Sequence, residues 1–255
     1  QIGQLFDRLD AGAWPDLETK LDREIDASVS AVVARRDGDL GRAVKQLDAA
    51  EQAALAVADA IVAGLRAAFP NDVSASTLAP AFDDFHADLR VVVVDHAFWL
   101  RAWSIDWLAR REAQPELDRA VETTNDFGAA FASMYGPAVG SQLQYHFHND
   151  TSDAVAYVLA SETGDRAVAD SIARQWSIDG IDLARQVALT SRAMPAERVQ
   201  RGVADAIGHE RAMIDARFVA DWESETSHYE SCVAAFAGVA DVVADAAARS
   251  PTLPR

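Results

Sequence analysis

Apolar residues recur every three or four positions along most of the chain, and Pro, Gly and Asp residues interrupt this pattern repeatedly. An apolar period of three to four residues indicates amphipathic α-helices, and Pro and Gly commonly mark where helices begin and end. No stretch alternates as a β-strand would. We therefore predict an all-α protein, an up-down bundle of about eight helices that is ferritin-like or a related four-helix bundle with an additional helix pair. The predicted helices cover residues 16–36, 39–69, 81–111, 115–135, 137–163, 165–192, 195–222 and 224–248.

A polar segment at residues 71–80, rich in Asn, Asp, Ser, Thr and Pro, interrupts the helical pattern. This composition is typical of a linker. We predict an N-terminal helix pair over residues 1–72, a linker over 73–80 and a helical bundle over 81–250.

A weak internal repeat relates the two ends of the chain. Residues 21–70 and 207–251 are both predicted helix pairs that end in an Ala/Val-rich helix followed by a proline. The N-terminal pair is therefore a candidate second half of a duplicated unit. Chance similarity between Ala-rich helices is the alternative explanation.

Charge and composition exclude several functions. The chain has 40 acidic and 23 basic residues and a net charge of −17, so we expect no nucleic-acid partner. The longest uninterrupted run of strongly apolar residues, Val91–Val94, is far shorter than the ~20 residues of a membrane-spanning helix, so we expect no membrane insertion. The single cysteine, Cys232, excludes an internal disulfide and a Cys-based zinc site. Residues 1–15 lack the layout of a signal peptide, which indicates a cytoplasmic protein unless a leader has been removed.

Histidines beside acidic residues are the strongest candidates for chemistry, because a buried polar group must be paired or functional. Only one Glu-x-x-His spacing, Glu225–His228, places a carboxylate and an imidazole on one helical face, as in the di-metal sites of ferritin-type bundles. Neighbours such as His209 and Glu210 lie about 100° apart on a helix and cannot both face inward. The candidate metal ligands are His96, His148, Asp150, His209, Glu225, His228 and Glu230. The metal would be iron, manganese or zinc; the alternative is a polar layer that fixes the register of the bundle.

No Gly-x-Gly-x-x-Gly, Walker, Gly-x-Ser-x-Gly or His-Glu-x-x-His motif occurs, which excludes most nucleotide enzymes, serine hydrolases and zinc proteases. Two functions remain open. The first is a non-enzymatic helical scaffold or assembly protein, whose partners would be further copies of this chain or other assembly proteins. The second is a bundle that binds a transition metal through His and carboxylate ligands.

From Asp95 onward the chain resembles a little-characterised bacterial family of helical proteins with a Glu-x-His-x-x-Trp-x-Arg start. The matching segments are His96-Ala-Phe-Trp99-Leu-Arg101, Tyr135-Gly136, Arg174-Gln-Trp176 and His209. The resemblance implies a helical bundle and no established activity. Where the family tends to have a histidine in the middle helix, this chain has Asp150, with His148 two residues earlier.

The acidic surface has two explanations that differ in their response to salt. Asp outnumbers Glu by 28 to 12 and Arg outnumbers Lys by 21 to 2, which fits either adaptation to high salt or a GC-rich genome. If the bias is an adaptation, repulsion among the acidic groups destabilises the fold in dilute buffer. The melting temperature should then rise steeply between ~0.1 M and ~2 M KCl, since added salt screens that repulsion. A flat response would favour the composition of the genome.

Overall fold

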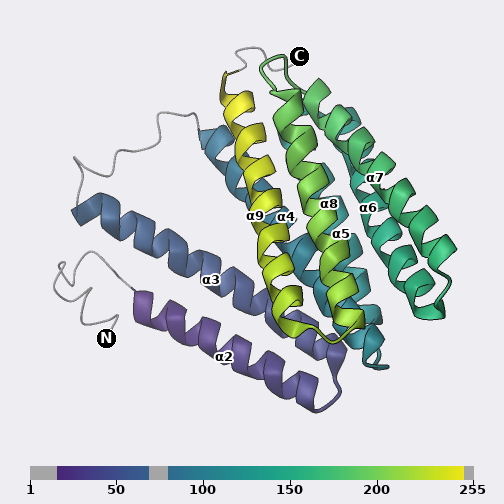
Figure 1. The fold of residues 1–255 in the computed structure, drawn as a ribbon. Coiled ribbons are helices and arrows are strands. Elements are labelled where there is room, and N and C mark those ends of the chain that lie inside the picture. Colours follow the sequence, from purple (N-terminus) through teal and green to yellow (C-terminus); the bar gives the residue numbers. More distant parts are fainter. Residues whose placement is uncertain (1–15, 69–79, 250–255) are drawn as a thin grey trace. The chain divides into compact units, whose positions relative to one another are not determined.

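The computed structural model describes residues 16–68 and 80–249, which form eight α-helices and no strand (Figure 1). The predicted all-α fold is therefore confirmed. The helices are α2 (Leu17–Arg36), α3 (Leu40–Ala68), α4 (Pro80–Leu108), α5 (Gln114–Tyr135), α6 (Pro137–Thr163), α7 (Arg166–Leu189), α8 (Ala196–Phe218) and α9 (Trp222–Arg249). Residues 1–15, which we examined for a signal peptide, lie outside the described part, as does all of the predicted linker except Pro80.

Several helix ends fall where the sequence has Pro, Gly or a capping Asp. Pro occupies the first turn of α5 and of α6, where its missing N–H costs no hydrogen bond. Asp165 caps α7, because its carboxylate accepts a hydrogen bond of 3.1 Å from the backbone N–H of Val168. Gly136 and Gly164 have φ values of 90° and 74°, which only glycine adopts without strain.

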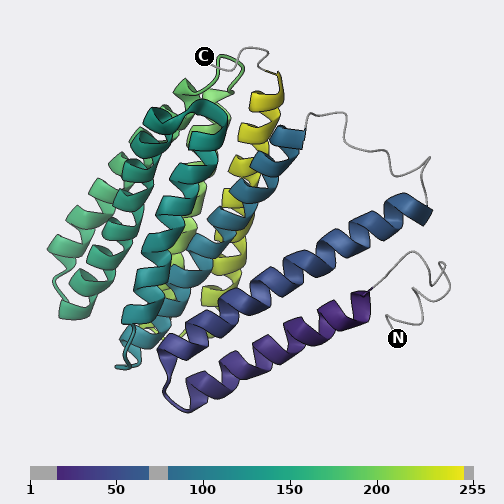
Figure 2. The ribbon, with the colours of Figure 1, turned by 180° about the vertical axis from the view of Figure 1, so that it is seen from behind.

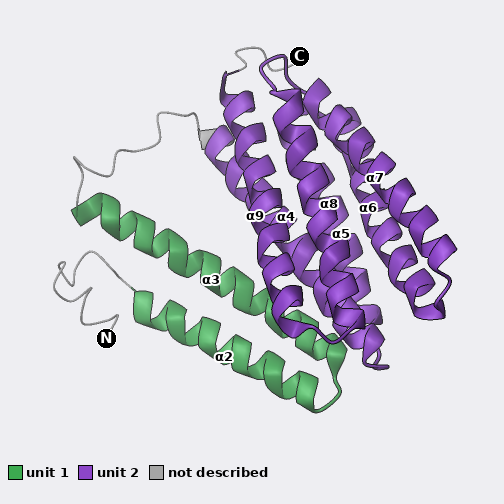
Figure 3. Ribbon diagram, viewed as in Figure 1, with its two compact units in different colours: residues 1–77 green, residues 78–255 purple. Residues whose placement is uncertain are grey.

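The chain divides into two compact units, residues 1–77 and 78–255 (Figure 3). In the first unit, α2 and α3 pack against each other as a helix pair around small and aliphatic residues. The second unit contains α4 to α9. The boundary between the units falls within residues 71–80, the segment whose composition we interpreted as a linker.

In the second unit each helix packs on the next one in the chain, and α9 returns to pack on α4 (Figures 1 and 2). The connections between these helices are so short that consecutive helices must run in opposite directions. The six helices therefore form a closed up-down array with one shared interior. Large side chains at less than 2% exposure fill it, among them Phe85, Trp99, Phe131, Phe147 and Trp176.

Helix α9 is long and apolar enough, by length and composition alone, to cross a membrane. Its most apolar 18-residue window has a mean hydropathy of 1.6, and 44% of that window is buried in the structure. Core helices of water-soluble proteins pass the same test. The window contains Asp241, which pairs with His86 and Arg90 of α4. In this structure α9 is one wall of the six-helix array.

Two glycines let α5 and α6 approach closely. A Cβ atom added to Gly140 would lie 2.4 Å from the carbonyl oxygen of Gly128 and 2.6 Å from Cβ of Ala132. Both distances are shorter than a van der Waals contact, and one of the atoms belongs to the backbone. The two helices would have to separate to accept any side chain here.

We predict opposite effects for two Gly-to-Ala substitutions. Gly140→Ala should lower the free energy of unfolding by about 1–3 kcal/mol, because it overpacks the contact between α5 and α6. Gly238→Ala, in α9 with nothing within 4 Å of the added Cβ, should raise it by about 0.5–1 kcal/mol through helix propensity. Denaturant titration measures both, and equal effects would contradict the close helix approach.

Candidate metal centre

His96 lies in the interior of the second unit and has no exposed surface. Its Nδ1 is 2.9 Å from Oγ1 of Thr123 on α5, and the Thr123 hydroxyl donates its own hydrogen to the carbonyl of Ala120 at 2.6 Å. The hydroxyl can therefore only accept from the imidazole, so Nδ1 carries the hydrogen. This contact turns Nε2 of His96 toward the centre of the helix array.

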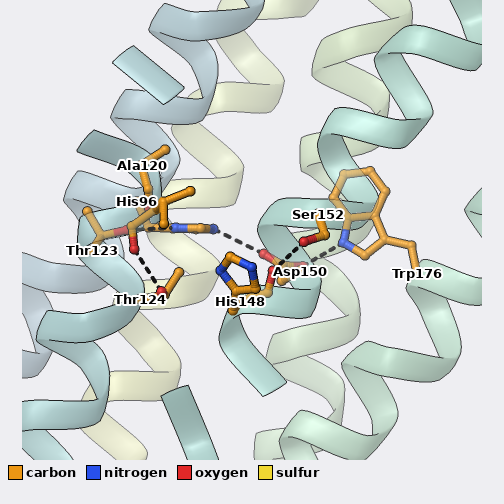
Figure 4. Close-up of polar contacts among 9 residues, drawn as sticks. His96, Ala120, Thr123, Thr124, His148, Asp150, Ser152 and Trp176 are labelled. Carbon is orange, nitrogen blue, oxygen red and sulfur yellow. Dashed lines mark hydrogen bonds and ion pairs between the residues drawn. The ribbon is translucent and has the colours of Figure 1, made fainter. Parts of the chain in front are cut away.

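Asp150 of α6 faces His96 and is 3% exposed. Its Oδ2 is 3.1 Å from Nε2 of His96, and its Oδ1 accepts a hydrogen bond of 2.5 Å from the indole N–H of Trp176 on α7 (Figure 4). Trp176 is itself fully buried, which fixes the direction of its N–H. Trp176 thus holds one oxygen of the Asp150 carboxylate, and the other oxygen faces Nε2 of His96.

Glu210 of α8 completes the cluster. It is 1% exposed, and neither carboxylate oxygen has a hydrogen-bond partner among the described residues. Burial raises the pKa of Glu210 well above its ordinary value, and the negative charge of Asp150 raises it further. A buried carboxyl group without a hydrogen-bond partner is costly in either protonation state.

The three side chains converge on one point. One ligand atom each from His96, Asp150 and Glu210 lies within 4.8 Å of the other two. An ion placed among such atoms would need only small side-chain rotations to reach metal–ligand distances of about 2.0–2.2 Å. Among the described residues, no other group of three or more His, Cys, Asp or Glu side chains converges in this way.

Apolar groups lie around this cluster. The ring of Phe147 lies 4.2 Å from that of His96, and Phe236 of α9 meets the same imidazole edge-on at 6.3 Å. Cys232 of α9 is also buried. Burial raises the pKa of its thiol, and the charges of Glu210 and Asp150 raise it further, which places the thiol near the two carboxyl groups.

The structure distributes the seven candidate ligands among different environments. His96 and Asp150 come together in the buried cluster. His148 and Glu230 are exposed, and the structure places neither in a group of converging ligands. His148 precedes Asp150 by two residues on α6, so the two side chains leave the helix in different directions.

Glu225 is buried for a different reason from the one we expected. Two arginines bind its carboxylate: Arg101 of α4 donates through Nε and Nη2 at 2.7 and 2.9 Å, and Arg217 of α8 lies at 3.2 Å. Burial alone would raise the pKa of Glu225, but these two cations outweigh it and lower the pKa. The carboxylate of Glu225 is thus engaged by arginines, and no converging group of ligands among the described residues contains it.

His228 instead lies beside His209, with 3.2 Å between the two Nδ1 atoms. Both imidazoles are half-buried, at the contact between α8 and α9. The structure thus brings two of the candidate histidines together, and no third ligand joins them among the described residues.

Glu210 is the ligand candidate that our sequence analysis missed. We chose His209 from the pair of neighbours, whereas α8 turns Glu210 inward. The spacing of apolar residues along α8 could have identified Glu210 as an inward-facing residue. The buried positions of this helix include Val203, Ala206, Ile207, Met213 and Ile214. Glu210 continues that spacing and His209 does not, so periodicity favours the glutamate as the inward residue.

Comparisons with family models, curated proteins and solved structures found no significant match to this chain. The resemblance to the bacterial helical family stays a prediction. The candidate site is consequently argued from its own geometry.

The buried carboxylate of Glu225 provides a test of the ion-pair assignment. Glu225→Gln should lower the free energy of unfolding by about 2–3 kcal/mol at pH 7, because it leaves two partly buried arginines without a counter-charge. Glu223→Gln, an exposed neutralisation in the same helical turn, should have little effect.

The cost of Glu225→Gln should also depend on pH. The native pKa of Glu225 lies below its ordinary value of 4.5, so its charge stabilises the fold above that value. This stabilisation is lost as the pH falls through the native pKa. Denaturant titrations from pH 7 downward should show the difference between wild type and variant shrinking only in acid; a difference that is constant with pH would contradict the assignment.

Proposed function

We propose that the second unit binds one divalent transition-metal ion through Nε2 of His96, Oδ2 of Asp150 and a carboxylate oxygen of Glu210. The observation that carries this proposal is the unpartnered carboxyl group of Glu210, which is buried within 4.8 Å of two further ligand atoms. Residues from α4, α6 and α8 supply the ligands, an arrangement like that of metal sites inside other helical bundles.

Charge balance supports a divalent cation. Asp150 and Glu210 carry two negative charges when ionised, and no Arg or Lys is seen to pair with either of them in the described structure. Two like charges buried close together repel strongly. A divalent ion neutralises both, replaces the missing hydrogen-bond donors of Glu210 and lowers the energy of the folded state.

The donor set and its surroundings indicate the class of metal. One imidazole nitrogen and two carboxylate oxygens suit Fe(II), Mn(II) and Zn(II). Thr123 and Trp176 orient His96 and Asp150 through hydrogen bonds to the atoms that face away from the ion, as outer partners do in known metal sites. Three protein ligands leave at least one coordination position for water or another small molecule.

Metal analysis of protein purified without a His tag tests the proposal. Wild type, depleted of metal and reloaded with Mn(II), Fe(II) or Zn(II), should retain one ion per chain at the buried site, and Glu210→Gln should lose it. The matched control is Glu230→Gln, the same substitution at an exposed glutamate of α9. Circular dichroism should show unchanged helix content in both variants.

The melting temperature provides a second test, because the order of wild type and Glu210→Gln should reverse when metal is added. Without metal, Glu210→Gln should melt at a higher temperature than wild type, because it removes a buried carboxyl group that disfavours the fold. With metal in excess the order should reverse, since an ion at about 100 times its Kd stabilises only the wild type, by about 2.7 kcal/mol.

If added metal changes the melting temperature of neither wild type nor Glu210→Gln, and neither protein retains an ion, the buried cluster is a polar layer that fixes helix register. The non-enzymatic scaffold expected from the sequence would then be the better account of the chain.

A further inference from the structure

The His209–His228 pair lies outside the proposed centre and has a geometry of its own. Its two Nδ1 atoms come from different helices and are 3.2 Å apart. Two nitrogens bound to one ion at about 2.0–2.1 Å are separated by about 2.9 Å at right angles and about 3.4 Å in a tetrahedron. The observed separation lies between these values, so two imidazoles that now share a hydrogen bond are already at the spacing of two ligands of one ion.

The pair is also placed beside the buried cluster. On α8, His209 directly precedes Glu210, and on α9, His228 lies one helical turn before Cys232. Glu210 and Cys232 both face the interior, whereas the two histidines are half-buried. The pair is therefore one residue from the buried carboxylate of Glu210 along α8, and one helical turn from the buried thiol of Cys232 along α9.

The surroundings of the pair favour a cation. Asp221, at the start of α9, interacts electrostatically with His228, and its exposed carboxylate faces solvent. Arg217 is held by Glu225, at 3.2 Å, and by the ring of Trp222. A cation near the imidazoles would therefore be attracted by the carboxylate of Asp221.

We propose that His209 and His228 form an outer metal site, which takes an ion such as Zn(II) or Co(II) from solvent and passes it to the buried centre. Two imidazoles and water hold the ion weakly enough to release it, and the exposed side of the pair lets hydrated ions enter. The outer site is independent of the proposed function; the transfer step rests on it. The transfer supplies a route to a centre whose three ligands are almost completely buried.

Titration of the full-length, metal-free protein with Co(II), followed by absorption spectroscopy and calorimetry, tests both parts. Wild type should bind two ions, and His209→Ala/His228→Ala should bind one, with the affinity of the remaining site unchanged. Loading of that site, measured by stopped flow, should slow by about tenfold, because the variant loses the high local ion concentration at the pair. His148→Ala, at an exposed histidine of α6, is the control and should load as wild type does.

The Glu210→Gln variant distinguishes failure of the outer site from failure of the buried centre. If Glu210→Gln keeps one ion that His209→Ala/His228→Ala loses, and wild type binds only that ion, the outer site stands and the buried centre fails. If the double variant binds as many ions as wild type, there is no outer site. If it binds one fewer but loads the buried site at the wild-type rate, transfer is overturned.

Discussion

Two buried carboxyl groups that lie close together are the constraint around which the second unit is arranged. Asp150 and Glu210 need positive charge or hydrogen-bond donors, and the fold supplies only part of this requirement. Each of the six helices contributes to the cluster or its surroundings, through His96 (α4), Thr123 (α5), Asp150 (α6), Trp176 (α7), Glu210 (α8) and Phe236 (α9). A one-residue rotation of any helix would remove its side chain from this set.

A second buried carboxylate, Glu225, has the positively charged partners that the central cluster lacks. Glu225 is as deeply buried as Glu210, yet two arginines from neighbouring helices neutralise it. Comparing the two glutamates shows what the central cluster lacks. The arginines of the protein itself stabilise the buried charge of Glu225. The carboxyl group of Glu210 has no such partner among the described residues and needs a proton or an ion from solvent. If the proposed ion binds at Glu210, the stability of the second unit depends on the supply of metal.

Much of the fold could be predicted from the sequence because helix boundaries are local. Pro137, Gly164 and Asp165 act within their own turn, and the three- to four-residue apolar period identifies the buried face of each helix. Part of the site followed from the same pattern. His96 and Asp150 both lie on buried faces, and they were among the candidates.

The remainder of the site depends on contacts between helices. The Glu225–His228 spacing permits a chelate on one helix. Arg101, more than a hundred residues earlier in the chain, instead forms hydrogen bonds with the carboxylate of Glu225. Spacing within a helix contains no information about such a partner. Glu210 was missed because its neighbour is a histidine, a more conspicuous ligand; the apolar period of α8, applied strictly, would have favoured the glutamate.

Anomalous X-ray diffraction from crystals grown with Mn(II) tests the central claim most directly, because it locates the ion rather than counting it. The account predicts a peak within about 2.0–2.3 Å of Nε2 of His96, of Asp150 and of Glu210. Full occupancy elsewhere with no peak among these three side chains, or no ordered ion at all, would contradict it.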